Sequence, residues 1–235
     1  MRIKKLSVLV LSVIMTFGFT ATAFADPNAS WNAGKGTATI DGQKDDAYAG
    51  AQEMKMEAVS DGSADGSAAS AWAIYDAEAI YVFVAVQDSE LDDANANVWE
   101  KDSVEFRFEN KNTLMQAYAV SETFDGTVAS EVKVLKTDVG YNVEFKVPYA
   151  TSEGGKVLFT LQVNCASGGK RNCTLHTNDD LKDAWQNDAV FETLVFSSNT
   201  AADAPKTGVE SFGLLFGIGA VASAVGAKVF KKREK

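Results

Sequence analysis

The pattern of apolar and polar positions between residues 69 and 197 is typical of a protein built from short β-strands. Residues 69–88 contain two runs of alternating character around an Asp-Ala-Glu-Ala turn. Similar short runs, separated by Gly, Asn, Asp and Ser, occupy residues 103–109, 115–121, 128–136, 141–149, 156–164 and 191–197. Side chains of a strand point alternately to its two faces, so this period indicates strands with one buried face. Strong helix signals are absent, and the pattern therefore predicts an all-β fold, an antiparallel β-sandwich of jelly-roll type.

Two longer apolar stretches at the ends of the chain do not fit this pattern. Basic residues among the first five precede an apolar run and an Ala-Phe-Ala site at residues 23–25, which predicts a secretory signal peptide over residues 1–25. Residues 212–230 would form an apolar helix roughly 28 Å long, close to the thickness of a hydrocarbon core. The basic residues 231–235 after it predict a transmembrane helix with a cytoplasmic C-terminus.

A short motif, Pro-Lys-Thr-Gly at residues 205–208, stands before the apolar C-terminal run. This order of motif, span and basic tail resembles the cell-wall sorting signal of Gram-positive surface proteins, with Ala204 where that signal usually has Leu. The resemblance implies that a sortase cuts between Thr207 and Gly208 and joins Thr207 to peptidoglycan. A plain single-pass membrane anchor is the alternative, and both interpretations place the protein at the cell surface.

The two ends leave about 180 residues, enough for one domain with a sizeable core. We expect a lead-in at residues 26–35, the β-sandwich at residues 36–197, a linker at residues 198–204 and the sorting signal at residues 205–235. Residues 26–204 hold 13 of the 22 Lys and Arg but 30 of the 32 Asp and Glu, a net charge of −17 against −10 for the whole chain. So acidic a surface argues against nucleic acid and anionic membrane surfaces as partners.

The chain has two cysteines, Cys165 and Cys173, on either side of a Gly-Gly turn. The flanking sequences are typical of hairpin arms, so we expect the two to face each other and to form a disulfide in an oxidising exterior. A zinc site is a poor alternative, because two cysteines and the single histidine, His176, fall short of four ligands.

Several motifs occur in an order that resembles a known family. They are ATIDGQKDDAYAGAQ, AWAIYDAEAIYVFVAVQDSEL, NVWEKDSVEFRFEN, YNVEFKVPY, LQVNCASGGKR and AWQNDAVFETLVF. Together they resemble family 9 carbohydrate-binding modules, within the wider group of DOMON-like sandwiches, over about residues 36–196. The segment around Trp99 and Glu105 is the most specific part of the resemblance.

The resemblance implies a site for a saccharide terminus of a cellulose- or xylan-type glycan. Such modules hold one sugar ring between two tryptophans, and by position Trp99 and Trp185 resemble these two walls. Flat aromatic rings cover the apolar C–H faces of a pyranose while polar groups take its hydroxyls. Glu105 matches a family carboxylate that accepts hydroxyl hydrogen bonds.

Other polar residues extend this candidate site. Gln116 and Asn164 fall on predicted strands at positions that reach the rim of the sugar. The chain departs from the family at Tyr118, near which an arginine is expected, and at Lys182, where an asparagine is expected. A hydroxyl and an ammonium can still bond a sugar, and these departures leave the identity of the sugar open.

The remaining candidates concern metals, catalysis and other classes of protein. No cofactor is required, but Asp88, Asp92 and Asp102 in acidic loops are candidates for a structural calcium site. No catalytic motif is present and His176 is the only imidazole, so we do not expect an enzyme. The alternatives are an adhesive surface protein that binds a protein or glycoprotein, and a haem-binding DOMON-like domain using His176 with Met54, Met56 or Met115. Trp72, which alternates with Ile74, is expected in the core.

Overall fold

The computed structural model of the chain describes residues 29–64 and 66–204. Within this part the regular structure is strand and short 3₁₀ helix, with no α-helix. The strands are β1 Ser30–Lys35, β2 Met54–Met56, β3 Ala58–Ser60, β4 Ala68–Tyr75, β5 Ala79–Gln87, β6 Ser103–Phe108, β7 Leu114–Tyr118, β8 Phe124–Gly126, β9 Glu131–Thr137, β10 Gly140–Pro148, β11 Lys156–Ser167, β12 Lys170–His176 and β13 Glu192–Phe196. The 3₁₀ helices are η1 Asp46–Gly50, η2 Val98–Glu100, η3 Asp179–Asp183, η4 Asp188–Val190 and η5 Ala201–Asp203. The predicted all-β class is confirmed.

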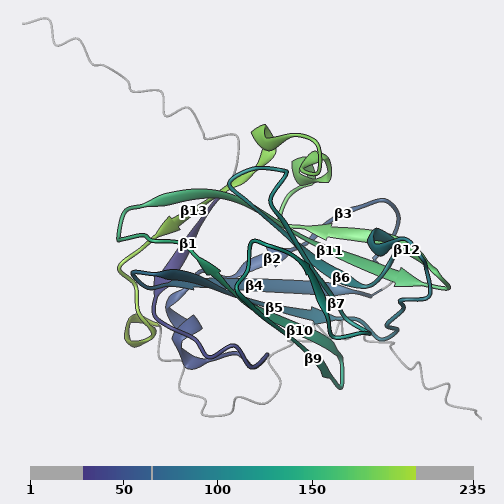
Figure 1. The fold of residues 1–235 in the computed structure, drawn as a ribbon, viewed down its shortest axis with the longest axis horizontal. Helices are drawn as coiled ribbons and strands as arrows, with labels where there is room; N and C mark the ends of the chain where they lie inside the picture. The colour runs from purple at the N-terminus through teal and green to yellow at the C-terminus, as the bar shows by residue number, and fades with distance from the viewer. Residues whose placement is uncertain (1–28, 65, 205–235) are drawn as a thin grey trace, which may run out of the picture. The chain divides into compact units, whose positions relative to one another are not determined.

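The strands form two layers, which we call sheet A and sheet B (Figure 1). Sheet A runs β8-β7-β6-β11, and the long β11 then pairs with β13 through its first half and with β12 through its second half. Strand β3 extends sheet A beyond β12. Sheet B runs β4-β5-β10-β9, with β2 on the other edge of β4.

Strand β1 connects the two sheets and corrects two expectations from the sequence. Its first half pairs with β13 of sheet A and its second half with β4 of sheet B, and both pairings are parallel. The sandwich is therefore not purely antiparallel, and residues 30–35 belong to it rather than to a lead-in. Gly34 is needed here, because a Cβ at this position would lie 2.6 Å from the backbone carbon of Gly50.

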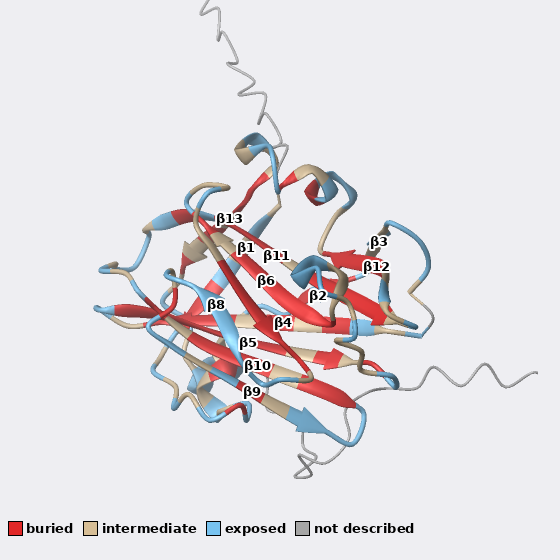
Figure 2. Cartoon of the chain, turned by 45° about the vertical axis from the view of Figure 1, so that its right-hand side comes forward, coloured by how far each residue is buried: buried red, intermediate tan, exposed pale blue. Residues whose placement is uncertain are grey.

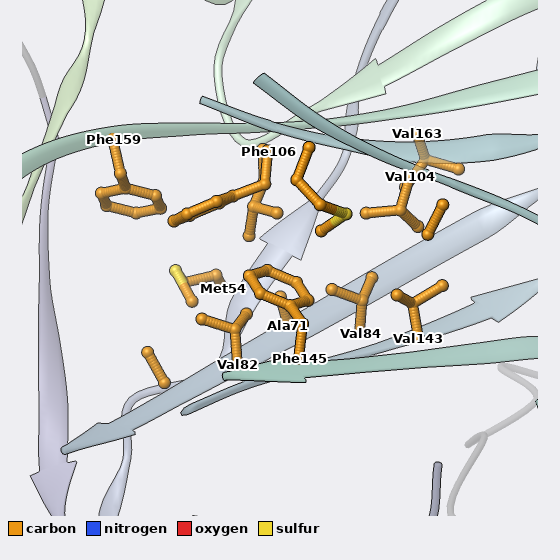
Figure 3. Close-up of a cluster of buried hydrophobic side chains, with 14 of the residues drawn as sticks. Met54, Ala71, Val82, Val84, Val104, Phe106, Val143, Phe145, Phe159 and Val163 are labelled. Atoms are coloured by element: carbon orange, nitrogen blue, oxygen red, sulfur yellow. The ribbon is translucent and has the colours of Figure 1, made fainter. Parts of the chain in front are cut away.

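The core lies between the sheets and is built by the alternation seen in the sequence. Val104, Phe106 and Phe108 of β6 point inward and meet residues of sheet B, with the rings of Phe106 and Phe145 4.9 Å apart. Figure 3 shows these side chains arriving from both layers. Each buried aliphatic or aromatic side chain of this kind contributes about 1.5–3 kcal/mol through loss of contact with water.

Sheet B is covered on its outer face as well, and this determines the place of Trp72. Tyr48, Ile74 and Phe83 form a second buried cluster on that face, with Trp72 half-buried at its edge. The Lys44 Nζ atom lies 3.0 Å from the centroid of the Trp72 ring, which is a cation–π contact. Trp72 thus packs against a hydrophobic core cluster, as expected, but this cluster lies outside the space between the sheets and leaves Trp72 half-buried.

The end of the described chain also packs on this side. Helix η5 has a capping box formed by Thr200 and Asp203. A Cβ on Gly50 would lie 2.5 Å from the carbonyl carbon of Thr200, so residues 198–204 pack against the domain instead of forming a free linker.

The hairpin between β11 and β12 has the expected form. Gly168 and Gly169 make its two-residue turn with φ values of +62° and +78°, which only glycine adopts readily. Cys165 and Cys173 are buried and lie opposite each other in register. The structure records both as thiols, and the hydrogen bond with Cys173, together with burial, raises the pKa of Cys165. Opposed residues of an antiparallel pair have Cα atoms about 4.5–5.5 Å apart, within the range for a disulfide. The disulfide stays a prediction.

The signal peptide, Thr207, Gly208 and the apolar C-terminal run lie outside the described residues. Within residues 29–64 and 66–204 no helix is long and apolar enough to span a membrane.

Candidate functional site

The outer face of sheet A carries a polar surface, which we call the floor. In β6, Ser103, Glu105 and Arg107 alternate with the inward-pointing valine and phenylalanines, so they share this outer face. Register places Glu105 opposite Gln116 of β7 on one side and Gln162 of β11 on the other. The alternation seen in the sequence therefore builds a continuous polar patch across three strands.

The floor is tied together by side-chain hydrogen bonds. Asn164 Nδ2 donates to Glu105 Oε1 at 2.9 Å and to Ser103 Oγ at 3.0 Å. Gln116 Nε2 donates to the same Ser103 oxygen at 2.9 Å. The second oxygen of Glu105 receives a charge-assisted bond from Arg107 at 3.0 Å. The Glu105 carboxylate is thus held in one orientation, with its charge compensated by Arg107.

Trp99 rises beside the floor on a segment that we call the first wall, residues 91–101. It sits in η2, and half of its surface is exposed. Gln116 Nε2 also donates to the carbonyl oxygen of Val98 at 3.1 Å, and Arg171 donates to that of Trp99 at 3.3 Å. No residue of η2 is buried. Polar contacts with the floor and with β12 therefore hold the backbone that carries Trp99.

Trp185 belongs to a second segment, residues 177–190, which we call the second wall. Trp185 is 61% exposed, while Leu181, Ala184 and Phe191, in and next to this segment, form a small buried cluster. Lys111, in the turn between β6 and β7, donates from its side chain to Gln186 O at 3.0 Å and from its backbone to Asp188 Oδ1 at 2.6 Å.

The two walls border the floor at opposite ends of β6. Trp99 lies just before Ser103, where β6 begins, whereas Gln186, next to Trp185, is bonded to the turn after β6 ends. Neither tryptophan is buried in the interior, as the sugar-binding hypothesis requires. Figure 2 shows the buried strands β6 and β11 running below the more exposed turns of this side.

The other predicted site residues are divided between the floor and its rim. Tyr118 is buried opposite Ser103, and its hydroxyl donates to Asp125 Oδ2 at 2.9 Å. Burial, followed by the bond with Asp125, raises the pKa of Tyr118. Lys182 is exposed in η3, three residues before Trp185.

Sequence reasoning missed several residues of this surface. Ser103, Arg107 and Gln162 share the parity of Glu105 and Asn164, so the two-residue period was the signal that would have found them. Arg171 and Lys111 gave no such signal, because their contacts with the walls join residues more than 70 positions apart.

The acidic residues suggested for calcium, which stays a prediction, accept hydrogen bonds from backbone N–H groups of the loops. Asp102 accepts bonds from the backbone N–H of Asp92 and of Ala166, and Asp92 accepts from Gly169 and Ala94. Asp88 accepts from Glu90 N at 3.0 Å. Burial raises the pKa of Asp102 to about 7, helped by the nearby charges of Asp88 and Asp92. Among the described residues no three His, Cys, Asp or Glu side chains are arranged to hold a metal, so this arrangement does not favour the calcium assignment.

The structure separates the residues proposed for haem. His176 lies on the outer face of sheet A, where its Nε2 contacts Ser60 Oγ at 3.2 Å and Thr174 Oγ1 at 3.1 Å. Met54, Met56 and Met115 belong to the core between the sheets. A haem held by His176 and one of these methionines does not fit this geometry.

A hollow of about 520 Å³ lies elsewhere on the domain. It is lined by Gly66, Gln87, Asp88, Ser89, Leu91, Thr137, Asp138, Val139 and Gly140. No aromatic side chain lines it, so it lacks the flat apolar surface that a sugar ring requires. The floor between the walls is the better candidate site.

A β-sandwich that presents a hydrogen-bonded polar floor and exposed tryptophans is typical of binding modules. The chain belongs to the carbohydrate family 9 binding domain-like family, whose model matches residues 40–199.

Similar proteins are multidomain enzymes and solved binding modules. The chain is 31% identical to endo-1,4-beta-xylanase A of Thermotoga neapolitana over 179 residues, and 29% identical to exoglucanase XynX of Acetivibrio thermocellus over 184 residues. These matches cover 68% and 69% of the chain but only 17% and 16% of the relatives. The chain therefore matches about a sixth of the length of each enzyme.

Two solved structures of a family 9 module from Caldicellulosiruptor kristjanssonii share the fold. The one in complex with glucose has a TM-score of 0.65 at 23% identity, covering 72% of this chain and 96% of the module. The one in complex with cellotriose has a TM-score of 0.65 at 22% identity, covering 79% of this chain and all of the module. At this identity the likeness concerns the fold alone.

Proposed function

We propose that the domain is a non-catalytic module that binds the terminus of a cellulose- or xylan-type saccharide between Trp99 and Trp185. The observation that carries the proposal is the pair of exposed indole rings at the two ends of one polar floor. Each exposed indole presents a flat apolar surface, and a pyranose offers a matching apolar face.

The polar groups of the floor suit the rim of such a ring. Glu105 is buried and bonded through both carboxylate oxygens, but each oxygen keeps a further lone pair, so we assign it the role of acceptor for sugar hydroxyls. Gln162 and Lys182 offer donors at its sides. Gln116, Tyr118 and Asn164 are buried and already bonded to protein groups. Their role is to hold Glu105 and the first wall in place.

Calorimetric titration of the purified chain with cellotriose and with xylo-oligosaccharides tests this function. We expect Trp99→Ala and Trp185→Ala each to weaken binding by about 1–3 kcal/mol, as expected when a stacked ring is removed. Val139→Ala is the matched control, because it removes another exposed apolar side chain from the turn between β9 and β10 of sheet B, away from the floor. If both tryptophan variants bind the sugar as tightly as the control does, the two rings do not form its binding site.

The ends of the chain support a place for this module at the cell surface. Residues 1–25 would direct export, and a sortase would join Thr207 to peptidoglycan after cutting before Gly208. The module would then present its saccharide site outside the cell. Cell fractionation followed by muramidase digestion tests the tether: wall-released protein ending at Thr207 supports it, and protein found only in the membrane with its basic tail intact refutes it.

A further inference from the structure

Arg171 of β12 joins three parts of the molecule that are distant in sequence. One terminal nitrogen, Nη1, lies 3.3 Å from the carbonyl oxygen of Trp99 and 3.4 Å from Asn164 Oδ1. The other, Nη2, forms an ion pair with Asp61 Oδ2 at 3.0 Å. Its backbone N–H donates to Glu100 Oε2 at 2.8 Å. The same residue therefore contacts the first wall twice and the floor once.

The geometry of the guanidinium gives these contacts their effect. Arginine is a planar fork of donors with no acceptor, and its directions are fixed by the plane. Both terminal nitrogens already donate to protein oxygens, in a side chain that is 22% exposed. Arg171 is thus arranged to hold Trp99 and Asn164 in a fixed relation rather than to reach a ligand.

Besides the bond from Gln116 to Val98 O, hydrogen bonds to the β11–β12 hairpin hold the first wall: Asn95 Nδ2 donates to Gly169 O, and Gly169 N donates to Asp92. No residue of η2 is buried, and its neighbours Leu91, Asp92 and Asp93 are only half-buried. An element without apolar burial must be held by hydrogen bonds, whose net contribution is larger when one partner is charged. Arg171 supplies the charged donor nearest to the indole-bearing residue.

We propose that Arg171 is a positioning residue for saccharide binding, which sets the distance between the Trp99 ring and the floor through the Trp99 carbonyl and Asn164. This inference rests on the proposed function of the slot. Arg171 raises the affinity for the sugar by holding Trp99 in place and does not itself contact the sugar.

A double-mutant cycle tests the proposal on the full chain, with cellotriose as the probe. We expect Arg171→Ala to lower affinity about tenfold or more in the native background. In the Trp99→Ala background the same change should lower affinity by no more than about twofold, because the ring that Arg171 positions is gone. Lys170→Ala, which removes a neighbouring exposed charge from the same hairpin, should leave affinity unchanged. Arg171→Lys should not restore binding, because one ammonium lacks the fork that reaches both acceptors.

A ligand-free readout separates this proposal from the function on which it rests. With 5-fluorotryptophan incorporated, Arg171→Ala should shift or broaden the fluorine resonance of Trp99 and leave that of Trp185 unchanged. If the native chain does not bind cellotriose, the proposed function is contradicted, while the fluorine spectrum still decides whether Arg171 holds Trp99. An unchanged Trp99 resonance overturns the proposal, and so does an equal loss of affinity with and without Trp99.

Discussion

The two walls of the candidate site hold their tryptophans by different physical means. The first wall, around Trp99, has no buried residue in η2 and is fixed by hydrogen bonds from Gln116 and Arg171. The second wall, around Trp185, rests on the buried cluster of Leu181, Ala184 and Phe191. Apolar burial is nearly independent of pH, whereas a polar tether depends on charge and geometry. The two sides of one slot should therefore respond differently to the same disturbance.

The second wall also has a polar anchor at its start. Asn178 caps η3 by accepting from the N–H of Asp180, and its amide donates to the buried Glu192 at 2.7 Å. Burial raises the pKa of Glu192. The main difference between the walls is the buried apolar cluster of the second wall, because η2 of the first wall has no buried residue.

The largest expected effect comes from removing that cluster. Phe191→Ala should destabilise the domain by about 3–5 kcal/mol, because it leaves a cavity where a fully buried ring had been. Hydrogen exchange measured by mass spectrometry should accelerate in residues 177–190 and change little in residues 91–101. Val190→Ala, at a half-buried neighbour, is the control and should have a much smaller effect. Equal acceleration in both walls would show that they do not act independently.

The next effect concerns the hairpin that supports the first wall. Three backbone N–H groups of this hairpin donate to acidic side chains in or next to the first wall. They are Ala166 to Asp102, Gly169 to Asp92 and Arg171 to Glu100. A Cys165–Cys173 disulfide would close a loop of about nine residues at its base and stabilise the protein by about 2–3 kcal/mol. Reduction should therefore loosen residues 91–101 more than residues 177–190.

Mass spectrometry of the unreduced exported protein measures the state of these cysteines, and hydrogen exchange of the Cys165→Ala, Cys173→Ala variant supplies the comparison. Two alkylatable thiols in that protein would refute the disulfide.

Changing the pH should affect the two walls in opposite directions. The pKa of Asp102, at the end of the first wall, is raised to about 7 by burial. Its contribution to stability is therefore complete below its ordinary pKa of 3.8 and is lost as the pH rises through 7. Burial lowers the pKa of His176, just before the second wall, to about 4. Its contribution is complete above its ordinary pKa of 6.5 and is lost as the pH falls from there to about 4.

Hydrogen exchange at pH 5 and pH 8, corrected for the intrinsic rate, measures this opposition. Residues 91–101 should open more at pH 8, and residues 177–190 more at pH 5. Asp102→Asn should weaken the pH dependence of exchange in residues 91–101, and His176→Gln should weaken that in residues 177–190. Dependence of the same sign in both walls would contradict the assignment of these two groups.

The smallest expected effect comes from removing the ion pair between Arg171 and Asp61. The side chain of Asp61 is 61% exposed, and exposed ion pairs contribute about 0–1 kcal/mol. Asp61→Asn should therefore reduce the affinity for cellotriose by less than about fivefold, clearly less than Arg171→Ala. A larger loss than that of Arg171→Ala would place the anchor of the first wall at Asp61 instead.

The sequence predicted the strands whose alternation is strong and missed those that are short. In strands β6 and β10 apolar core residues alternate with polar residues over most of the strand, and such runs are hard to mistake. Strands β2, β3 and β8 have three residues each, too few to establish a period. The face on which Trp72 lies could not be predicted, for another reason. Alternation shows that Trp72 and Ile74 share a face, but it cannot tell which face of a sheet looks inward when both are covered.

The candidate site was predictable where it follows the strand period and unpredictable where it depends on contacts across the chain. Glu105, Gln116 and Asn164 fall on one face because of that period, and register brings them together. The anchors Arg171 and Lys111 act through bonds to wall residues that folding alone brings near. Asp88, Asp92 and Asp102 were interpreted as cation ligands because loop acids commonly serve that role. Here they accept N–H groups of the turns that support the first wall.

The central claim is that Trp99 and Trp185 together contact one saccharide. The most direct measurement is an NMR titration of the four indole N–H resonances with cellotriose, each assigned by a single tryptophan-to-phenylalanine variant. The account predicts that the resonances of Trp99 and Trp185 shift along one saturable curve while those of Trp31 and Trp72 stay in place. Shifts confined to Trp31 or Trp72, or separate curves for Trp99 and Trp185, would contradict a shared slot.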